Sequence, residues 1–459
     1  MENILLIDFG STYTKVTAVD LTHHKLLGNA SAYTTVATDV RDGLASALDE
    51  LKLRTGLADF SKRLACSSAA GGLRMVACGL VPDLTAKAAS LASLGAGAKV
   101  IGLYSYQLTE DDIEDIAIKS PDILLLTGGT DGGNTKYILE NAAKLAEGPG
   151  EFPIIVAGNR SCGRQVKRIL ENRNVYLCEN VMPSLGVINI EPTRQLIREI
   201  FLERIVKAKG LSAEAGLIDG ILMPTPAAVM SAVELLANGC DGEPGIGNLI
   251  AVDVGGATTD VYSVAAGTPS GVNTIYKGLP EPYAKRTVEG DIGMRYSAPG
   301  VVDAAGIARI SEVSGLSEEF VLEGVARLAT ETDSLPQTPE QKALDFALAA
   351  LSIETATLRH AGTIEEVFTT SGRAFVQTGK DLTDVSRIVM TGGALLYADK
   401  HWELASYAKQ SDLFPFSLRP KKADLLVDKH YILAAMGLLS GIAPLPALRI
   451  LKEGCELWS

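Results

Sequence analysis

Two stretches of the sequence share one form: an apolar strand ending in an acidic residue, a turn rich in glycine and hydroxyl side chains, and a returning strand. The first is the strand at residues 4–7, followed by DFGSTYTK (8–15) and a strand that continues to residue 20. The second is LIAVDVGGATTDVYSV, which begins at residue 249. Short apolar runs bounded by glycine are typical of buried strands. One such hairpin opening each half of the chain predicts an internally duplicated α/β fold.

The sequence between the two hairpins alternates strand and helix patterns. From residue 99 to about 180 this alternation predicts βαβ units on a parallel sheet. Residues 193–209 and 227–238 have the apolar spacing of helices. The densest cluster of helix and strand breakers is NGCDGEPGIGN at 238–248, where we expect the domain boundary. The predicted organisation is a first domain at 1–240, with an additional βαβ region at about 99–180, and a second domain at 246–459.

Both hairpin turns have the chemistry of a phosphate site. Glycine lets backbone N–H groups approach a phosphate closely, and hydroxyl side chains add further donors. Asp8 and Asp253 end their strands beside these turns, and they are the candidates to hold Mg²⁺, a cation that prefers oxygen ligands. A third motif, RIVMTGGA at 387–394, ends a strand in a glycine pair against which an adenine or ribose could lie. Each motif alone is compatible with a plain tight turn, whereas the three in this order are specific.

Several functional classes are excluded by composition or by missing motifs. No GxxxxGK[ST] run and no GxGxxG after a strand occur, which excludes a P-loop and leaves a dinucleotide fold without its fingerprint. Lys and Arg total 42 against 55 Asp and Glu, a formal charge of −13 with no basic run, so nucleic acid is not an expected partner. Six cysteines without a CxxC pair, and a start without a signal peptide pattern, predict free thiols and a cytoplasmic protein.

One apolar stretch, at residues 431–448, is nearly long enough to cross a membrane. It contains Pro444 and Pro446, and proline interrupts a helix by removing a backbone donor. We therefore expect a buried helix that ends near Ile442, and no membrane span.

Across nearly the whole chain, the order of the three motifs resembles the superfamily of actin, Hsp70 and the acetate and sugar kinases. The resemblance implies two actin-like (ribonuclease H-like) ATPase domains that face a nucleotide cleft and use ATP and Mg²⁺. In that superfamily the two hairpins grip the phosphates and the late glycine pair seats the adenosine. Carried over position by position, it assigns phosphate contacts to Gly10, Ser11, Thr12, Tyr13, Gly255, Gly256, Ala257 and Thr258, and adenosine contacts to Gly392, Gly393 and Ala394.

The catalytic candidates are Asp8, Asp253 and Asp260. Phosphoryl transfer depends mainly on positioning and charge neutralisation, so the site needs a metal and an oriented water more than a strong base. Asp260 and Asp291 are the acidic candidates for orienting that water, with a turn or helix cap as the alternative for each. Lys15 is a candidate phosphate contact, with a solvated lysine on the returning strand as the alternative.

Three further strings narrow the family: SSAAGGLRMVACGL from residue 67, LLTGGTDGGN from 125 and KRTVEGDIGMRYSA from 285. Together with DFGSTYTK and DVGGATTDVY, they closely resemble the glutamate mutase accessory protein family called GlmL or MutL. The resemblance implies a chaperone-like reactivating factor for an adenosylcobalamin-dependent mutase. Glutamate (methylaspartate) mutase is the first expectation, and an ornithine or lysine aminomutase is the alternative. Whether the protein forms a homodimer is left open.

Other functions of the same superfamily remain as alternatives at this point. A small-molecule kinase would need an acidic base beside a substrate hydroxyl, and no motif for one is visible. An activator of 2-hydroxyacyl-CoA dehydratases would carry an iron-sulfur cluster, which six scattered cysteines argue against. A non-enzymatic filament protein is the third alternative. The string LLTGGTDGGN could bind a second ligand or could be a strand-to-helix turn.

Overall fold

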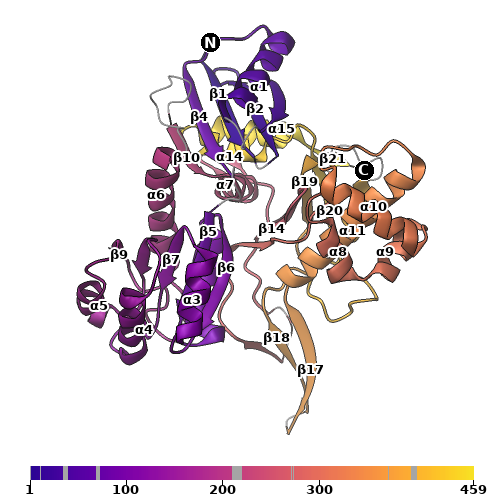
Figure 1. Cartoon of the computed structure of the whole chain (residues 1–459). Coiled ribbons are helices and arrows are strands. Elements are labelled where there is room, and N and C mark those ends of the chain that lie inside the picture. Colours follow the sequence, from indigo (N-terminus) through magenta and orange to yellow (C-terminus); the bar gives the residue numbers. More distant parts are fainter. Residues whose placement is uncertain are drawn as a thin grey trace. The chain divides into compact units, whose positions relative to one another are not determined.

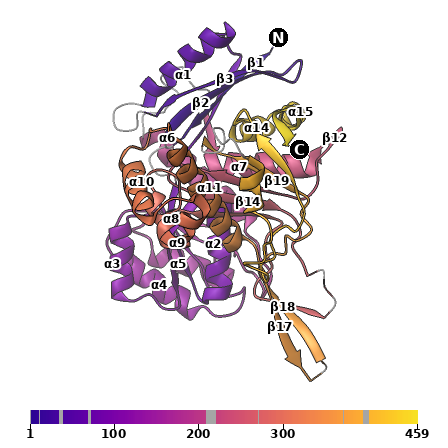
Figure 2. The same cartoon turned by 90° about the vertical axis from the view of Figure 1, so that its right-hand side faces the viewer.

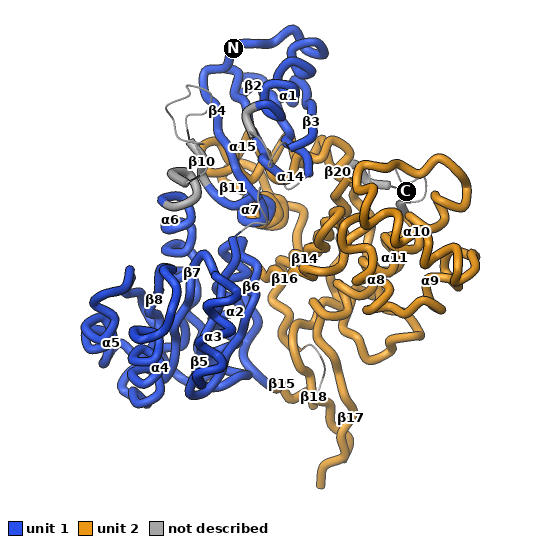
Figure 3. The backbone as a smooth tube through the Cα atoms, in the orientation of Figure 1, with its two compact units in different colours: residues 1–229, 278–282 blue, residues 230–277, 283–459 orange. Residues whose placement is uncertain are grey.

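The structure is a computed structural model that describes residues 2–10, 12–34, 40–68, 73–208, 220–269, 271, 273–370, 372–393 and 401–458. The chain divides into two compact units, which are coloured separately in Figure 3. Unit 1 comprises Met1–Val229 and Gly278–Pro282, and unit 2 comprises Met230–Lys277 and Tyr283–Ser459.

Unit 1 opens with a five-stranded mixed sheet built around the first hairpin. Its strands are β1 (Asn3–Phe9), β2 (Tyr13–Asp20), β3 (Lys25–Tyr33), β4 (Lys62–Ser67) and β10 (Gly220–Pro224). They lie in the order β10-β4-β1-β2-β3, with β1, β2 and β3 antiparallel and β4 and β10 parallel to β1. Helix α1 (Val40–Thr55) packs on β2 and β3, where Leu44 and Leu51 share a core with Ile7. The predicted first hairpin is confirmed.

Unit 1 also contains a second, fully parallel sheet in the order β6-β5-β7-β8-β9. Its elements are β5 (Leu73–Gly79), η1 (Pro82–Ala86), α2 (Lys87–Gly95), β6 (Ala98–Ser105), α3 (Glu110–Lys119), β7 (Ile123–Leu126), α4 (Lys136–Glu147), β8 (Ile154–Val156), η2 (Arg160–Cys162), α5 (Gly163–Ile169), β9 (Val175–Leu177) and α6 (Glu191–Ala208). On β5, Met75 and Ala77 face a core shared with α2 and α6, whereas Val76 and Cys78 face α3, α4 and α5. Both faces are therefore covered, as a parallel sheet requires.

This sheet is larger than the region expected at about 99–180, because β5 lies upstream of residue 99. Strand β5 is nevertheless an interior strand that pairs with both β6 and β7. The sequence pattern did not predict it, because a five-residue π-helix, η1, begins three residues after its end. That short element breaks the strand-to-helix rhythm on which the prediction depends.

Helix α7 (Thr225–Asn238) contains the division between the two units, at Val229 and Met230. The glycine-rich cluster at 238–248, where we expected the boundary, contains a small hairpin of β11 (Gly239–Cys240) and β12 (Glu243–Pro244) in unit 2. Gly239 has a φ of +79°, and a Cβ atom there would lie 2.3 Å from the nitrogen of Gly245. The glycines close this hairpin tightly. The division into compact units lies upstream of the hairpin.

Unit 2 repeats the first sheet of unit 1. Its sheet consists of β13 (Leu249–Val254), β14 (Thr259–Val264), β16 (Ala284–Glu289), β19 (Arg387–Thr391), β20 (Asp424–Asp428) and β21 (Cys455–Trp458). The order is β16-β14-β13-β19-β20-β21, with β13, β14 and β16 antiparallel and β19 and β20 parallel to β13. Apart from β21, this is the order and direction of β3-β2-β1-β4-β10. The predicted duplicated α/β fold is confirmed.

Helices cover one face of this second sheet, as Figure 1 and Figure 2 show. They are α8 (Ala298–Ala305), α9 (Ile307–Ser314), α10 (Glu318–Thr330), α11 (Pro339–His360) and α13 (His401–Ser406). Helix α11 is the most buried, and its apolar side chains share a core with Ile250 and Val252 of β13. Thr338 and Gln341 form a reciprocal capping box at its start.

A small separate sheet in unit 2 has no counterpart in the first sheet of unit 1. It has the order β15-β18-β17, with β15 (Thr274–Lys277), β17 (Thr363–Thr369) and β18 (Gly372–Thr378). Strands β17 and β18 form a long hairpin that projects from the rest of unit 2 (Figure 1).

The apolar stretch at 431–448 forms two helices, α14 (Leu433–Ser440) and α15 (Pro444–Gly454). Helix α14 ends two residues before Ile442, and Pro444 begins the next helix at a position that tolerates proline. In the described ranges, no helix is both long enough and apolar enough to cross a membrane.

Candidate nucleotide site

The first hairpin turns sharply between β1 and β2 because of Gly10. The nitrogen of Gly10 donates a hydrogen bond to the carbonyl oxygen of Tyr13 at 3.1 Å. A Cβ atom on Gly10 would lie only 2.5 Å from that oxygen, so this close turn requires glycine. The carbonyl oxygen of Thr12 accepts a hydrogen bond from Thr34 N at 2.8 Å. Ser11, also predicted to contact phosphate, lies outside the described residues.

Asp8 lies at the carboxyl end of β1, opposite Lys15 on β2 and Cys66 on β4. Asp8 is only 6% exposed. Thr225 Oγ1 donates to Asp8 Oδ1 at 2.6 Å, and Lys15 Nζ lies 3.4 Å from Oδ2. Lys15 therefore pairs with this carboxylate, and its contact with a phosphate stays a prediction.

Cys66 also contacts Asp8, with its Sγ 3.5 Å from Oδ1. Burial raises the pKa of the Cys66 thiol well above its ordinary value, and the negative charge of Asp8 raises it further. The thiol is consequently neutral and donates to the carboxylate. The sequence analysis missed both Cys66 and Thr225. Their only signals are their places, Cys66 near the end of the parallel strand β4 and Thr225 at the start of α7.

The second hairpin has the same turn geometry as the first. The nitrogen of Gly255 donates to the carbonyl oxygen of Thr258 at 2.9 Å. The segment at 290–297 braces the turn through two backbone hydrogen bonds. Met294 N donates to Gly255 O at 3.0 Å, and Arg295 N donates to Gly256 O at 2.9 Å. This brace gives a structural role to the string KRTVEGDIGMRYSA. Ala257 lies at the tip of the turn, between the two braced glycines and Thr258.

Asp253 is the second-last residue of β13, as Asp8 is of β1. It lies opposite Asp260 on β14 and opposite Thr391 on β19. The equivalent neighbours of Asp8 are Lys15 and Cys66. The two units thus place a carboxylate at equivalent points of their two sheets.

Asp260 is held in a buried ion pair. Arg286 Nε donates to Asp260 Oδ1 at 2.8 Å, and Thr258 Oγ1 donates to Oδ2 at 3.3 Å. Burial alone would lower the pKa of Arg286, but the charge of Asp260 and the nearby Tyr262 outweigh it, so the pKa is raised. Asp291, the other acidic candidate, is exposed.

The glycine pair after β19 consists of two unlike positions. Gly392 has a φ of +114°, and a Cβ atom there would lie 2.4 Å from Val254 O and 2.9 Å from Asp253 Oδ1. The backbone of Gly392 therefore approaches the candidate metal carboxylate as closely as only glycine can. Gly393 is exposed, with open space where its Cβ would be. Ala394 lies outside the described residues.

Asp428, at the end of β20, connects this edge of the sheet to α14. It accepts from Thr391 Oγ1 at 3.0 Å and from the nitrogens of Ile432 and Leu433 at 2.9 and 3.2 Å. Burial raises the pKa of Asp428 despite these donors. The sequence analysis did not single out this residue, since its partners follow only from the parallel pairing of β19 and β20.

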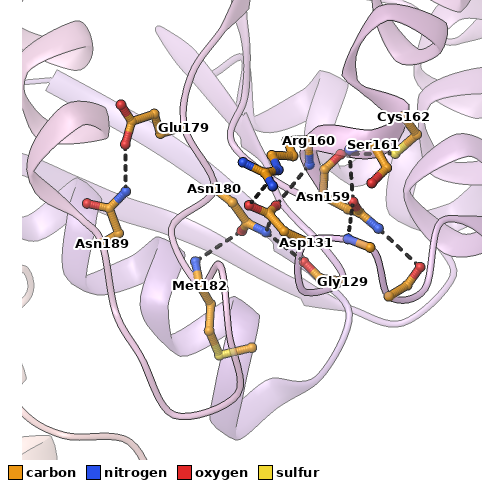
Figure 4. A network of polar contacts seen from close by, with 12 residues as sticks. Gly129, Asp131, Asn159, Arg160, Ser161, Cys162, Glu179, Asn180, Met182 and Asn189 are labelled. Carbon is orange, nitrogen blue, oxygen red and sulfur yellow. Dashed lines mark hydrogen bonds and ion pairs between the residues drawn. The ribbon is translucent and has the colours of Figure 1, made fainter.

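The loop that contains LLTGGTDGGN is closed by its own hydrogen bonds, as Figure 4 shows. Asn159 Oδ1 accepts from Gly132 N at 3.1 Å, and Asn180 Nδ2 donates to Gly129 O at 3.0 Å. Gly158 packs against the loop so closely that a Cβ there would lie 2.8 Å from Gly128 N. Close packing and internal bonding account for these residues as a strand-to-helix turn, without a ligand.

The family model described as MutL protein matches residues 4–455. The chain belongs to the MutL protein family. Protein MutL of Clostridium tetanomorphum is 45% identical to it over 459 residues, which are 99% of each chain. The family expected from the sequence strings, the glutamate mutase accessory family, is thereby confirmed.

Solved structures resemble this MutL family member only remotely. Component A of the (R)-2-hydroxyglutaryl-CoA dehydratase of Acidaminococcus fermentans is 10% identical, covers 99% of both chains and has a TM-score of 0.32. The activator of the 2-hydroxyisocaproyl-CoA dehydratase of Clostridium difficile, with bound ADPNP, is 9% identical over all of both chains, with a TM-score of 0.34. The xylulose kinase of Lactobacillus acidophilus is 12% identical, covers 100% of this chain and 93% of its own, and has a TM-score of 0.35. The family assignment does not depend on these likenesses.

Proposed function

We propose that this MutL family member binds ATP with Mg²⁺, hydrolyses it slowly, and uses the resulting conformational change to reactivate an adenosylcobalamin-dependent mutase. Glutamate (methylaspartate) mutase is the client that we propose. The observation that carries the ATP site is the repeated arrangement of Asp8 and Asp253. Each lies at the end of the first strand of its own unit's sheet and is followed by a turn that glycine makes tight.

The residues fit phosphates and Mg²⁺. In the described part of the chain, no group of three or more His, Cys, Asp or Glu side chains gathers that could hold a metal. Mg²⁺ usually takes one or two carboxylates and completes its shell with phosphate oxygens and water. Asp8 and Asp253 are carboxylates of this kind, and the metal would neutralise phosphate charge when bound.

The surrounding residues prepare Asp8 for that role. Thr225 fixes the orientation of its carboxylate through the 2.6 Å hydrogen bond, and Lys15 supplies a positive charge beside it. The turn at Gly10 exposes Tyr13, which is 42% accessible at the hairpin. In the other unit, Arg286 holds Asp260 in place, and Gly393 offers bare backbone on which an adenosine could lie.

Energy from ATP would serve a protein partner rather than a metabolite. Nucleotide binding shifts a two-state protein only if the two states bind the partner differently. Moving such an equilibrium from about 1:99 to 99:1 takes about 5.5 kcal/mol of differential binding. A mutase that has lost its adenosyl radical holds damaged cobalamin, and an ATP-driven partner could supply the opening that the mutase itself lacks.

The first test measures ATP binding by calorimetry and hydrolysis by phosphate release. Asp8→Asn and Asp253→Asn should each abolish hydrolysis while the fold persists. The matched control is Asp20→Asn, because Asp20 lies on the same first hairpin and is as buried as Asp8, at 4% exposed, but ends the other strand. Unchanged turnover in both site variants would reassign the metal site, and no ATP binding at millimolar concentration would end the proposal.

The second test uses glutamate mutase that has been inactivated by turnover. Activity should return when this protein, ATP, Mg²⁺ and fresh adenosylcobalamin are added together, and omission of ATP or use of the Asp8→Asn variant should prevent recovery. Equal recovery without nucleotide would refute the ATP-driven mechanism. Phosphorylation of a metabolite, without any response from the mutase, would favour a kinase instead.

A further inference from the structure

The small sheet β15-β18-β17 is an addition to the duplicated fold, since the first sheet of unit 1 matches the second sheet without it. Its outermost strand, β17, is regular along its whole pairing with β18, without a bulge. Exposed edge strands are usually blunted by bulges, lysine or proline, because open N–H and C=O groups recruit other strands. Strand β17, TIEEVFT, contains no lysine or proline.

One end of the open edge of β17 is already paired. The nitrogen of Ile364 donates to the carbonyl oxygen of Phe416 at 2.9 Å, and Thr363 forms an antiparallel bridge with Ser417. In an antiparallel ladder, alternate residues direct their backbone groups to the same side. The N–H groups of Glu366 and Phe368 therefore point to the same side as that of Ile364.

The segment that pairs with Ile364 turns away before it reaches Glu366. Phe414 N donates to Ser411 O at 3.0 Å, and Ser417 N donates to Phe414 O at 3.1 Å, so the chain folds into tight turns here. Within the part of the chain that the structure describes, the edge from Glu366 to Phe368 has no backbone partner. A strand added along this edge would extend the pairing that Phe416 and Ser417 already make with Ile364 and Thr363.

The side chains along this edge combine exposed aromatic groups with acidic ones. Phe368 is 83% exposed and Phe416 is 63% exposed. Phe368 lies on the same face of β17 as Ile364 and Glu366, because residues two apart on a strand share a face. Phe416 lies on this face too, because it stands opposite Ile364. Glu366 is paired with Arg373 of β18. Glu365, on the other face, has no ion-pair partner among the described residues and is exposed.

The charge at this edge selects the kind of strand that could add to it. The unpaired carboxylate of Glu365 and the pairing of Arg373 to Glu366 leave the edge acidic, in a chain with a formal charge of −13. A second copy would bring two more glutamates to the same edge, and like charges on neighbouring strands destabilise pairing. A segment with lysine or arginine opposite Glu365 and an apolar residue beside Phe368 would be complementary.

We propose that the edge of β17 from Glu366 to Phe368 is the docking site for an extended basic segment of the client enzyme, which adds as the next strand beside β17. This inference rests on the proposed function for the identity of the client. Main-chain hydrogen bonds supply affinity in such strand addition, and the flanking side chains supply specificity.

The experiment measures binding of glutamate mutase to the full-length protein by biolayer interferometry, together with the rate of ATP hydrolysis. Phe368→Pro removes an outward N–H group and blocks the edge, but leaves the ladder with β18 intact because Phe368 does not donate to that strand. It should weaken binding about tenfold or more. Phe368→Ala keeps the donor and should lose less affinity. Glu365→Lys should weaken binding and reduce its salt dependence.

A matched control is Ile118→Ala on α3 of unit 1, because Ile118 is also 83% exposed. It should bind the mutase as the wild type does, and all four variants should hydrolyse ATP at the wild-type rate. Wild-type affinity in Phe368→Pro would overturn the docking site while leaving the proposed function intact. Failure of the wild type to bind the mutase would overturn both. A dimer of the wild type that Phe368→Pro converts to a monomer, seen by sedimentation velocity, would identify a second copy as the occupant and overturn the inference.

Discussion

Replacing Gly392 by alanine should destabilise unit 2, whereas the same change at Gly393 should not. At Gly392 the backbone has a φ of +114°, which residues with a side chain rarely adopt. The added Cβ would lie 2.4 Å from Val254 O and 2.8 Å from Val254 N. These contacts are with backbone of the central strand β13, so no flexible side chain can move away. The conformational strain costs about 1–3 kcal/mol and the overpacking about 1–3 kcal/mol, so we expect a loss of about 2–6 kcal/mol in the free energy of unfolding.

The assay can follow unit 2 alone, because both tryptophans of the chain, Trp402 and Trp458, belong to it. Urea unfolding monitored by tryptophan fluorescence should therefore shift to lower denaturant in Gly392→Ala. Gly393→Ala is the matched control, since its Cβ would meet nothing within 4 Å. It should unfold within about 0.5 kcal/mol of the wild type, as most surface changes do. Equal stability of the two variants would refute the close approach of Gly392 to β13.

Two further predictions concern buried charges in unit 2. Arg286→Met should cost about 3–5 kcal/mol in the free energy of unfolding, because it leaves Asp260 buried without its partner. The double variant that also carries Asp260→Leu should recover most of that loss. Equal stability of the single and double variants would contradict the ion pair. His360 is buried between Thr287 and Ser263, and burial, with Lys285 and Lys380 nearby, lowers its pKa well below the ordinary 6.5. Below pH 6.5 the unfolded chain therefore binds a proton at His360 that the folded chain does not bind. The contribution of the neutral His360 to the free energy of unfolding is complete above pH 6.5 and falls by about 1.4 kcal/mol per pH unit below it. In urea titrations at pH 5.5 and 7.5, His360→Gln should lack this part of the pH dependence.

The sequence predicted those features that depend on neighbours along the chain. The turns at Gly10 and Gly255 follow from glycine beside an apolar strand, because the hydrogen bonds that close them join residues three positions apart. The break at Pro444 follows from the missing backbone donor of proline. The duplication was visible for the same reason, since each half opens with such a local signal.

Features that depend on distant pairing were not predictable. Thr225 contacts Asp8 across 217 residues and Cys66 contacts it across 58 residues, through two parallel pairings of β4. Nothing in the local sequence of Thr225 distinguishes it from an ordinary residue at the start of a helix. The same holds for Asp428, whose contact with Thr391 requires the register of β19 and β20.

The repeated register also shows where the two halves have diverged. Opposite Asp8 stands a lysine, so the first turn pairs its carboxylate with a cation from the returning strand. Opposite Asp253 stands a second carboxylate, and its balancing cation, Arg286, comes from the third strand instead. At these opposite positions the first hairpin therefore places a lysine beside its carboxylate, whereas the second places two carboxylates side by side. Because the two sheets place these groups at equivalent points, the difference lies in the side chains alone. Under the proposed function, both turns would offer a carboxylate to Mg²⁺, and only the first would add a lysine from the returning strand beside the phosphates.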